Sequence, residues 1–141
     1  MTALTAAYEQ SPVRKLNILL VDDHEPSGKI EGALLRELGH TYDIVVNGLE
    51  ALKKFSENSY DLVFLDLQMP GIDGLETARR MREFEKSGKR PATPIIGMTG
   101  RATEDDKMLC LKAGMDDYLS KPFRLSELET KIFNFSVNAP A

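Results

Sequence analysis

The sequence predicts an α/β fold, an open doubly wound sheet in which five parallel strands alternate with five helices in a (βα)5 arrangement. Two observations carry this prediction. Short, nearly continuous apolar runs recur along the chain, as is typical of strands that helices cover on both faces. A stretch with apolar residues at helical spacing follows each run. Such alternation implies right-handed crossovers between parallel strands.

The first strand is predicted at 16–21, where five of the six residues are apolar. The helix after it has Pro26 in its first turn, where the missing N–H of proline is tolerated, and Gly39 as its stop. The face of this helix that is predicted to pack on the sheet is formed by Ile30, Leu34 and Leu38.

The second strand is predicted at 42–46, and the third, which has the clearest pattern, at 61–67. The helix between them is indicated by Leu49, Leu52 and Phe55. A loop after the third strand is marked by Pro70, Gly71 and Gly74. The helix that follows the loop is indicated by Leu75, Ala78, Met81 and Phe84.

The fourth strand is predicted at 94–99 and the fifth at 117–121. Between them a helix begins at Thr103, whose hydroxyl can cap the amide of Asp106, and Gly114 can close it. The apolar stripe of the final helix is formed by Leu128, Ile132 and Phe135. These elements predict one domain at 15–135, a flexible leader at 1–14 and a tail at 136–141.

Composition narrows the class of protein. A net charge of −4 and a pI near 5.2 argue against a nucleic-acid-binding domain. The sequence contains no apolar stretch of membrane-spanning length and no secretory signal pattern, so we expect a cytoplasmic location without a membrane partner. The single cysteine, Cys110, is expected to pack as a small apolar residue. Surface positions are predicted for His24, Arg79, Arg80 and Arg82, and no functional role is expected of His40.

Polar side chains stand at the carboxyl ends of four predicted strands, which is the edge where open α/β sheets place their sites. These residues are Asp22 and Asp23 after the first strand, Asp66 in the third, Thr99 in the fourth and Lys121 in the fifth. Carboxylates that lie close together repel one another, and a hard divalent cation such as Mg²⁺ relieves that repulsion. A carboxylate can also attack phosphorus to form an acyl phosphate, while a lysine neutralises the phosphoryl oxygens.

Four segments resemble the response-regulator receiver family: 21–23 (VDD), 61–71 (DLVFLDLQMPG), 98–100 (MTG) and 113–123 (AGMDDYLSKPF). They occur in the family's order and spacing over roughly residues 15–135. The resemblance implies a flavodoxin-like receiver fold with strand order 2-1-3-4-5. The part of the chain with Cys110, Met115 and 118–121 is similar to receivers of hybrid sensor histidine kinases, and a single-domain response regulator is the alternative.

The resemblance also implies roles for the residues that match the motifs. Asp66 is then the phosphoacceptor, Thr99 the switch hydroxyl, Tyr118 the switch aromatic and Lys121 the cation that pairs with the phosphate. The implied Mg²⁺ ligands are Asp23, Asp66, the backbone carbonyl of Gln68 and, through water, Asp22. Mn²⁺ could substitute, and no other cofactor is implied. The bond between Lys121 and Pro122 is expected to be cis.

The implied function is that of a phosphorylation switch, not of an enzyme, although slow autodephosphorylation is expected. The phosphoryl group would come from the phosphohistidine of a sensor histidine kinase or of a histidine phosphotransfer protein. A homodimer through the face formed by the helix after Thr103, the strand 117–121 and the final helix is a further expectation. No nucleic-acid partner is expected.

Several alternatives compete with this interpretation. Asp22 and Asp23 could merely cap the first helix, Lys121 could be a surface charge, and Tyr118 could be an ordinary half-buried aromatic. A haloacid-dehalogenase-like phosphatase needs a second acid two residues after the nucleophile, where this chain has Gln68. A flavodoxin-like electron carrier is disfavoured because the acidic segment after the first strand would repel a flavin phosphate. A receiver-like interaction module that no longer takes phosphate remains a third alternative.

Overall fold

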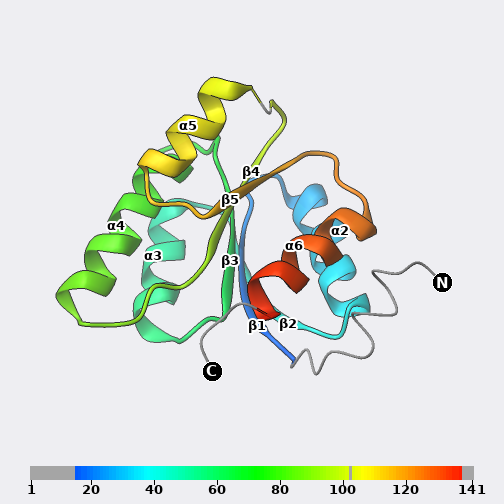
Figure 1. Ribbon diagram of the computed structural model, residues 1–141, viewed down its shortest axis with the longest axis horizontal. Helices are drawn as coiled ribbons and strands as arrows, with labels where there is room; N and C mark the ends of the chain where they lie inside the picture. Colours follow the sequence, from blue (N-terminus) through cyan, green and yellow to red (C-terminus); the bar gives the residue numbers. More distant parts are fainter. Residues whose placement is uncertain (1–14, 102, 138–141) are drawn as a thin grey trace.

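The computed structural model describes residues 15–101 and 103–137, which form a parallel sheet with helices on both faces (Figure 1). The strands are β1 (Asn17–Val21), β2 (Thr41–Val45), β3 (Leu62–Asp66), β4 (Ile95–Thr99) and β5 (Asp117–Ser120). The helices are α2 (Glu25–Glu37), α3 (Gly48–Glu57), α4 (Gly74–Ser87), α5 (Glu104–Lys112) and α6 (Leu125–Val137).

The sheet order is β2-β1-β3-β4-β5 with every pair parallel, so the predicted fold class and strand order are confirmed. The predicted leader at 1–14 lies outside the described residues. Helix α6 runs to Val137, two residues past the predicted domain end at 135, and residues 138–141 also lie outside the described residues. In the described part of the chain no helix is both long enough and apolar enough to cross a membrane.

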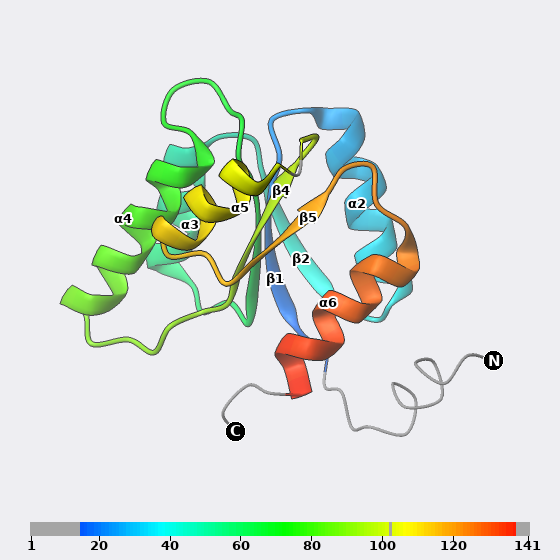
Figure 2. The same cartoon turned by 45° about the horizontal axis from the view of Figure 1, so that its top comes forward.

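The sheet separates two apolar cores. Helices α3, α4 and α5 cover one face, and α2 and α6 cover the other (Figures 1 and 2). Because successive side chains of a strand point to opposite faces, Leu19 and Val21 of β1 enter the first core and Ile18 and Leu20 the second. Strand β3 is buried at every position, which explains why its sequence is almost continuously apolar.

Helix α2 packs on the sheet through a different face from the predicted one. Ile30 is 64% exposed, whereas the buried positions are Gly28, Glu31, Gly32 and Leu35. The two glycines explain this rotation, because a Cβ at position 32 would lie 2.5 Å from the Tyr42 ring. The helix therefore turns its glycines to the sheet, and Leu34 and Leu38 are only partly buried beside the second core.

Helix α3 shows the same kind of departure at its first turn. Leu49 is 64% exposed, and Gly48, Ala51 and Phe55 form the buried face. Leu52 packs at the margin of the first core. The prediction for α4 is confirmed, because Ala78 and Met81 are fully buried and Leu75 and Phe84 pack against the same core.

The predicted helix ends are confirmed by their hydrogen bonds and backbone angles. The Thr103 side chain caps α5 by accepting a hydrogen bond from the Asp106 amide at 3.1 Å. Gly39 and Gly114 follow α2 and α5 with φ angles of 93° and 97°, a region that glycine enters without strain.

Two residues have structural roles that were not predicted: His40, which had no assigned role, and Arg82, which was predicted at the surface. His40 is 5% exposed, and its Nδ1 accepts a hydrogen bond from the Leu16 amide at 3.1 Å; burial lowers its pKa. Arg82 donates to the carbonyl oxygens of Thr93 and Gly114, each at 2.8 Å, and thereby ties α4 to the loops that flank β4 and β5. The other three surface predictions hold, for His24, Arg79 and Arg80.

The prediction for Cys110 is also confirmed. Its side chain is 1% exposed within the first core, and burial raises the pKa of its thiol. The thiol therefore packs as a small apolar group.

Candidate functional site

The candidate site lies where the carboxyl ends of β1, β3, β4 and β5 meet. Figure 2 shows the loops that leave these strands gathered at one end of the sheet. Carboxylate oxygens of Asp22, Asp23 and Asp66 lie within 4.8 Å of one another. The predicted clustering of these three acids is therefore present in the structure.

Asp22 is fully buried and has a hydrogen-bond partner on each carboxylate oxygen. Its Oδ1 accepts from the His24 amide at 2.9 Å, and its Oδ2 accepts from Lys121 Nζ at 2.7 Å. Burial opposes ionisation of Asp22, but hydrogen bonds with Glu31 and Lys121 outweigh it and hold its pKa below the usual value. Asp22 is thus kept as a carboxylate inside the protein, whereas Asp23 is exposed.

Asp66 ends β3 and is 7% exposed. Its Oδ1 accepts a hydrogen bond from the Gln68 amide at 3.2 Å, which orients the carboxyl plane. Burial raises its pKa to about 6, and this rise is moderated by Lys121 and by the Gln68 amide. The carboxylate is therefore ionised at neutral pH but poorly hydrated, a combination that suits a nucleophile.

Lys121 is the cation of the site. Its Nζ lies 2.7 Å from Asp22 Oδ2, 3.6 Å from Asp66 Oδ2 and 3.8 Å from Glu31 Oε2. Burial disfavours its charge, but the hydrogen bond to Asp22 and the nearby carboxyl groups raise its pKa overall. The peptide bond to Pro122 is cis, as expected.

Glu31 was missed by the sequence analysis. It is 6% exposed, and burial together with a hydrogen bond to Asp22 raises its pKa to about 9. The spacing in the sequence does indicate a buried position for Glu31. It lies three residues after Gly28 and four before Leu35, so the three residues share one helix face. The aliphatic side chain of Ile30 directed the prediction to the neighbouring face.

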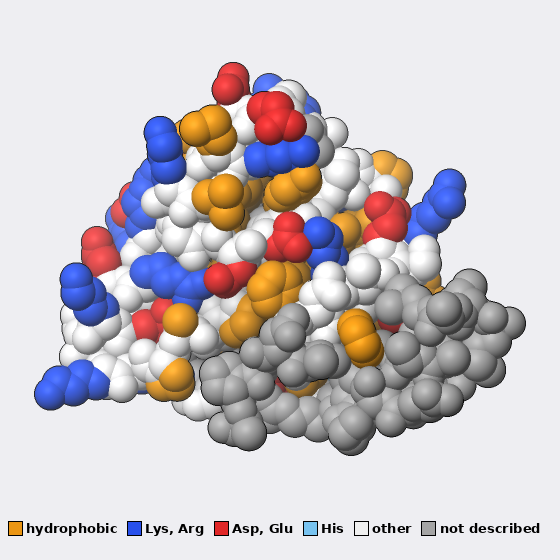
Figure 3. Space-filling model, viewed as in Figure 1, with side chains coloured by type: hydrophobic (Ala, Val, Ile, Leu, Met, Phe, Trp, Pro, Cys, Tyr) orange, Lys and Arg blue, Asp and Glu red, His pale blue; other side chains and the backbone are white. Residues whose placement is uncertain are grey.

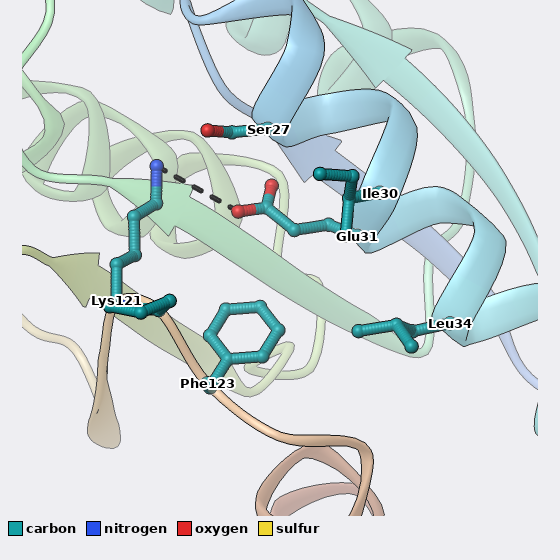
Figure 4. Close-up of a pocket in the computed structure, with 7 residues that line it drawn as sticks. Ser27, Ile30, Glu31, Leu34, Lys121 and Phe123 are labelled. Carbon is teal, nitrogen blue, oxygen red and sulfur yellow. Dashed lines mark ion pairs between the residues drawn. The ribbon is translucent and has the colours of Figure 1, made fainter.

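A cavity of about 300 Å³ opens beside Lys121, between α2 and the segment that follows β5 (Figure 4). Its lining comes from Ser27, Ile30, Glu31, Leu34, Lys121, Pro122 and Phe123. Figure 4 shows that the Glu31 carboxyl reaches from α2 toward the Lys121 ammonium.

Thr99 ends β4 at the same edge but is turned to the loop after the strand. Its hydroxyl donates to the Arg101 carbonyl at 2.8 Å and accepts from the Arg101 amide at 3.0 Å. With 4% exposure Thr99 is slightly more buried than Asp66, which is 7% exposed. The hydroxyl would have to leave Arg101 before it could bind a group on Asp66.

Tyr118, the predicted switch aromatic, lies on the edge strand of the sheet. It is in β5, half-buried against the first core, with Lys107 Nζ 5.0 Å and Lys131 Nζ 5.7 Å from its ring centroid. These two lysines come from α5 and α6, and cation–π attraction favours this position of the ring. Tyr118 thus connects the strand next to the site with both flanking helices.

Comparison with known proteins gives a consistent result. The response regulator receiver domain family matches residues 18–133. Hybrid signal transduction histidine kinase L of Dictyostelium discoideum is 37% identical over 134 residues, which are 92% of this chain but 8% of that protein. The chain therefore spans less than a tenth of the length of this relative.

Two solved structures share the fold closely. The receiver domain of a Saccharomyces cerevisiae response regulator, crystallised with a histidine phosphotransfer protein, has a TM-score of 0.81 and 34% identity, covering 90% of this chain and 92% of that one. The receiver domain of a Pseudomonas aeruginosa sensor histidine kinase has a TM-score of 0.79 and 33% identity, covering 89% and 100%. The latter structure contains a magnesium ion in its active site cleft.

Proposed function

This chain belongs to the response regulator receiver domain family and is a receiver domain of two-component phosphorelays, and we propose that Asp66 is its phosphoacceptor. The observation that carries the proposal is the position of Asp66. Its carboxylate is buried at a strand end, clustered with Asp22 and Asp23, and 3.6 Å from the Lys121 ammonium. A nucleophilic oxygen, an acidic cluster and a cation are thereby combined at one point.

We propose that Mg²⁺ is held by Asp23, Asp66 and the Gln68 backbone carbonyl, and through water by Asp22. The donor set fits this cation, because it consists of oxygen atoms and the three carboxylates converge within 4.8 Å. Mn²⁺, which also accepts oxygen ligands, is expected to substitute. When bound, the ion would offset the negative charge of the carboxylates and of the oxygens of the phosphoryl group that is being transferred.

In the proposed reaction an Asp66 oxygen attacks the phosphorus of a phosphohistidine on the side opposite the P–N bond. The P–O bond forms as the P–N bond breaks. The electron pair of the P–N bond stays with the departing imidazole, which takes up a proton. The Gln68 amide keeps the Asp66 carboxyl oriented during the attack. Lys121 shifts from Asp22 to a phosphoryl oxygen, a short movement because it already lies 3.6 Å from Asp66.

The phosphoryl group then offers Thr99 a charged acceptor in place of the Arg101 carbonyl. Rotation of Thr99 would free space that Tyr118 can enter, and Tyr118 would release its contacts with Lys107 and Lys131. The result is a shift between two populations, which differ in the surface formed by α5, β5 and α6. A homodimer through this surface is one proposed output.

The proposed donor is a histidine phosphotransfer protein or a sensor histidine kinase. The yeast receiver that resembles this chain was crystallised with such a phosphotransfer protein. We propose that the signal is lost by slow autodephosphorylation. Water attacks the phosphorus, the bond between phosphorus and the Asp66 oxygen breaks, and inorganic phosphate leaves. The chain would then act as a switch whose state depends on supply from its donor.

Phosphotransfer from a donor phosphorylated on histidine tests this function. A panel of phosphotransfer proteins carrying a radiolabelled phosphohistidine is mixed with the chain, with Mg²⁺ or with EDTA. We expect label to move to the chain from at least one donor, with Mg²⁺ only, and to be acid-stable but alkali-labile, as an acyl phosphate is. A chain that stays unlabelled by all donors and by acetyl phosphate, while a control receiver is labelled, would be an interaction module instead.

A further inference from the structure

Glu31 is an acidic side chain in the interior of α2, on the helix face that packs against the sheet. Its neighbours on this face are two glycines and a leucine, Gly28, Gly32 and Leu35. The residue is 6% exposed, although acidic residues almost never lie this deep without a compensating partner. Its burial therefore needs an explanation from its surroundings.

The contacts of Glu31 are with the phosphorylation site. Its Oε2 lies 3.8 Å from Lys121 Nζ, and its carboxyl forms a hydrogen bond with Asp22. Figure 4 shows that it approaches the ammonium from the α2 side, across the cavity that Phe123 also lines. Lys121 is thereby placed between carboxyl groups from two sides, Glu31 on α2 and Asp66 on β3.

Stability does not account for this side chain. Glu31 Oε1 is buried and has no hydrogen-bond partner among residues 15–101 and 103–137. A buried polar atom without a partner costs free energy, whereas a leucine of similar size would bury apolar area beside Leu34 and Phe123. The position thus carries a group that the packing does not favour but that reaches the cation of the site.

We propose that Glu31 is a positioning residue that restrains Lys121 on the α2 side of the site and so slows phosphoryl transfer to Asp66. The inference rests on the proposed function, in which Lys121 must move onto a phosphoryl oxygen. A group that attracts Lys121 before transfer, and less so in the transition state, stabilises the ground state and raises the barrier. Removal of the Glu31 carboxyl leaves Lys121 with Asp22 and Asp66, the two buried carboxyl groups of the acid cluster itself.

Three variants separate this role from a structural one. Glu31→Leu removes the carboxyl but keeps the volume. Glu31→Gln keeps the shape and a polar contact to Asp22 and Lys121. Glu25→Gln is the matched control, because Glu25 lies on the same helix but with 76% of its side chain exposed. Each variant is labelled with acetyl phosphate and Mg²⁺, the initial rate of Asp66 phosphorylation is followed by intact-protein mass spectrometry, and thermal unfolding is measured in parallel.

The expected result is that Glu31→Leu is labelled at least about threefold faster than the wild type, while Glu31→Gln and Glu25→Gln stay within about twofold. A Glu31→Leu rate less than about threefold above that of the wild type, or below it, with an intact fold, would overturn the inference. If Glu31→Leu does not fold, Glu31→Met gives the same comparison with a more flexible apolar chain. A wild type that takes no label would instead overturn the proposed function, and this inference with it.

Discussion

Asp66 combines burial with a charge that the fold only partly compensates. Its carboxylate is 7% exposed, and burial raises its pKa to about 6 against the opposing influence of Lys121. Asp22 belongs to the same cluster and is fully buried, but its pKa is lowered because hydrogen bonds with Glu31, Lys121 and the His24 amide outweigh the effect of burial. The site therefore holds one carboxylate that the protein stabilises and another, Asp66, whose charge a divalent cation would stabilise.

Replacing Asp66 with asparagine should stabilise the protein in the absence of divalent cations. Between pH values of about 4 and 6 the folded state holds a proton on Asp66 that the unfolded state has released, so the wild type loses stability as the pH rises through this window. The variant has no such loss. The free energy of unfolding should rise on the order of 1–3 kcal/mol at a pH of about 8, and much less at about 4.5.

Urea unfolding in EDTA, followed by far-UV circular dichroism at both pH values, measures this gain. Asp73→Asn is the control, because Asp73 is an exposed helix cap that asparagine replaces equally well. An Asp66→Asn gain that is equal at the two pH values, or a loss at the higher one, would contradict the assigned ionisation of Asp66.

At the scale of elements, the sequence predicted the strands and their order of appearance because apolar runs and turn residues report local structure directly. The strand-end residues Asp22, Asp66, Thr99 and Lys121 were found for the same reason, since each interrupts or ends such a run. The structure places all four at the carboxyl edge of the sheet.

Helix rotation was not predictable from apolar spacing alone. Ile30 and Leu49 are apolar and correctly spaced but exposed, because glycines at 28, 32 and 48 allow α2 and α3 to approach other elements closely. Glu31 was missed in consequence. The structural roles of Arg82 and His40 were missed because the groups they bind come from segments distant in sequence.

The junction between β3 and α4 tolerates no side chain at its first helical position. A Cβ at Gly74 would contact the Asp66 carbonyl oxygen and would lie 2.8 Å from Leu67 Cα, both of them backbone atoms. Gly74→Ala should therefore displace the backbone beside the phosphoacceptor. We expect it to destabilise the protein by about 1–3 kcal/mol and to slow labelling of Asp66 by acetyl phosphate.

Gly100→Ala is the matched comparison, since nothing lies within 4 Å of a Cβ there. Its free energy of unfolding should stay within about 0.5 kcal/mol of the wild type, with unchanged labelling. Urea titration and the labelling assay check both variants. A Gly74→Ala protein with wild-type stability and rate would show that the loop position does not depend on this contact.

At the scale of the whole molecule, the site lies at the carboxyl edge of the sheet, and the proposed output surface is formed by α5, β5 and α6. Thr99 is bound to Arg101 and Tyr118 lies between two lysines, an arrangement expected of the unphosphorylated state. Helix α5 exposes Met108, Leu109 and Leu111, and Figure 3 shows hydrophobic side chains among charged ones on this part of the surface. Such residues can form an interface once the surface is rearranged.

Phosphorylation should change the dynamics of α5, β5 and α6 as a unit. Hydrogen exchange of the wild type with acetyl phosphate and Mg²⁺ is expected to differ from the untreated protein in residues 104–137. Thr99→Ala should still be labelled but should lose most of this difference, because its hydroxyl is the proposed link. Equal exchange changes in the variant and the wild type would remove Thr99 from the switch. Sedimentation of the same samples reports whether a dimer forms.

Site-resolved labelling with a small phosphoryl donor tests the central claim most directly. The wild type, Asp66→Asn and Asp73→Asn are treated with acetyl phosphate and Mg²⁺, and intact mass and peptide mapping locate the modification. We expect one phosphoryl group on the wild type and on Asp73→Asn, located on Asp66, and none on Asp66→Asn. Stoichiometric labelling of Asp66→Asn, or a label on another residue of the wild type, would contradict it.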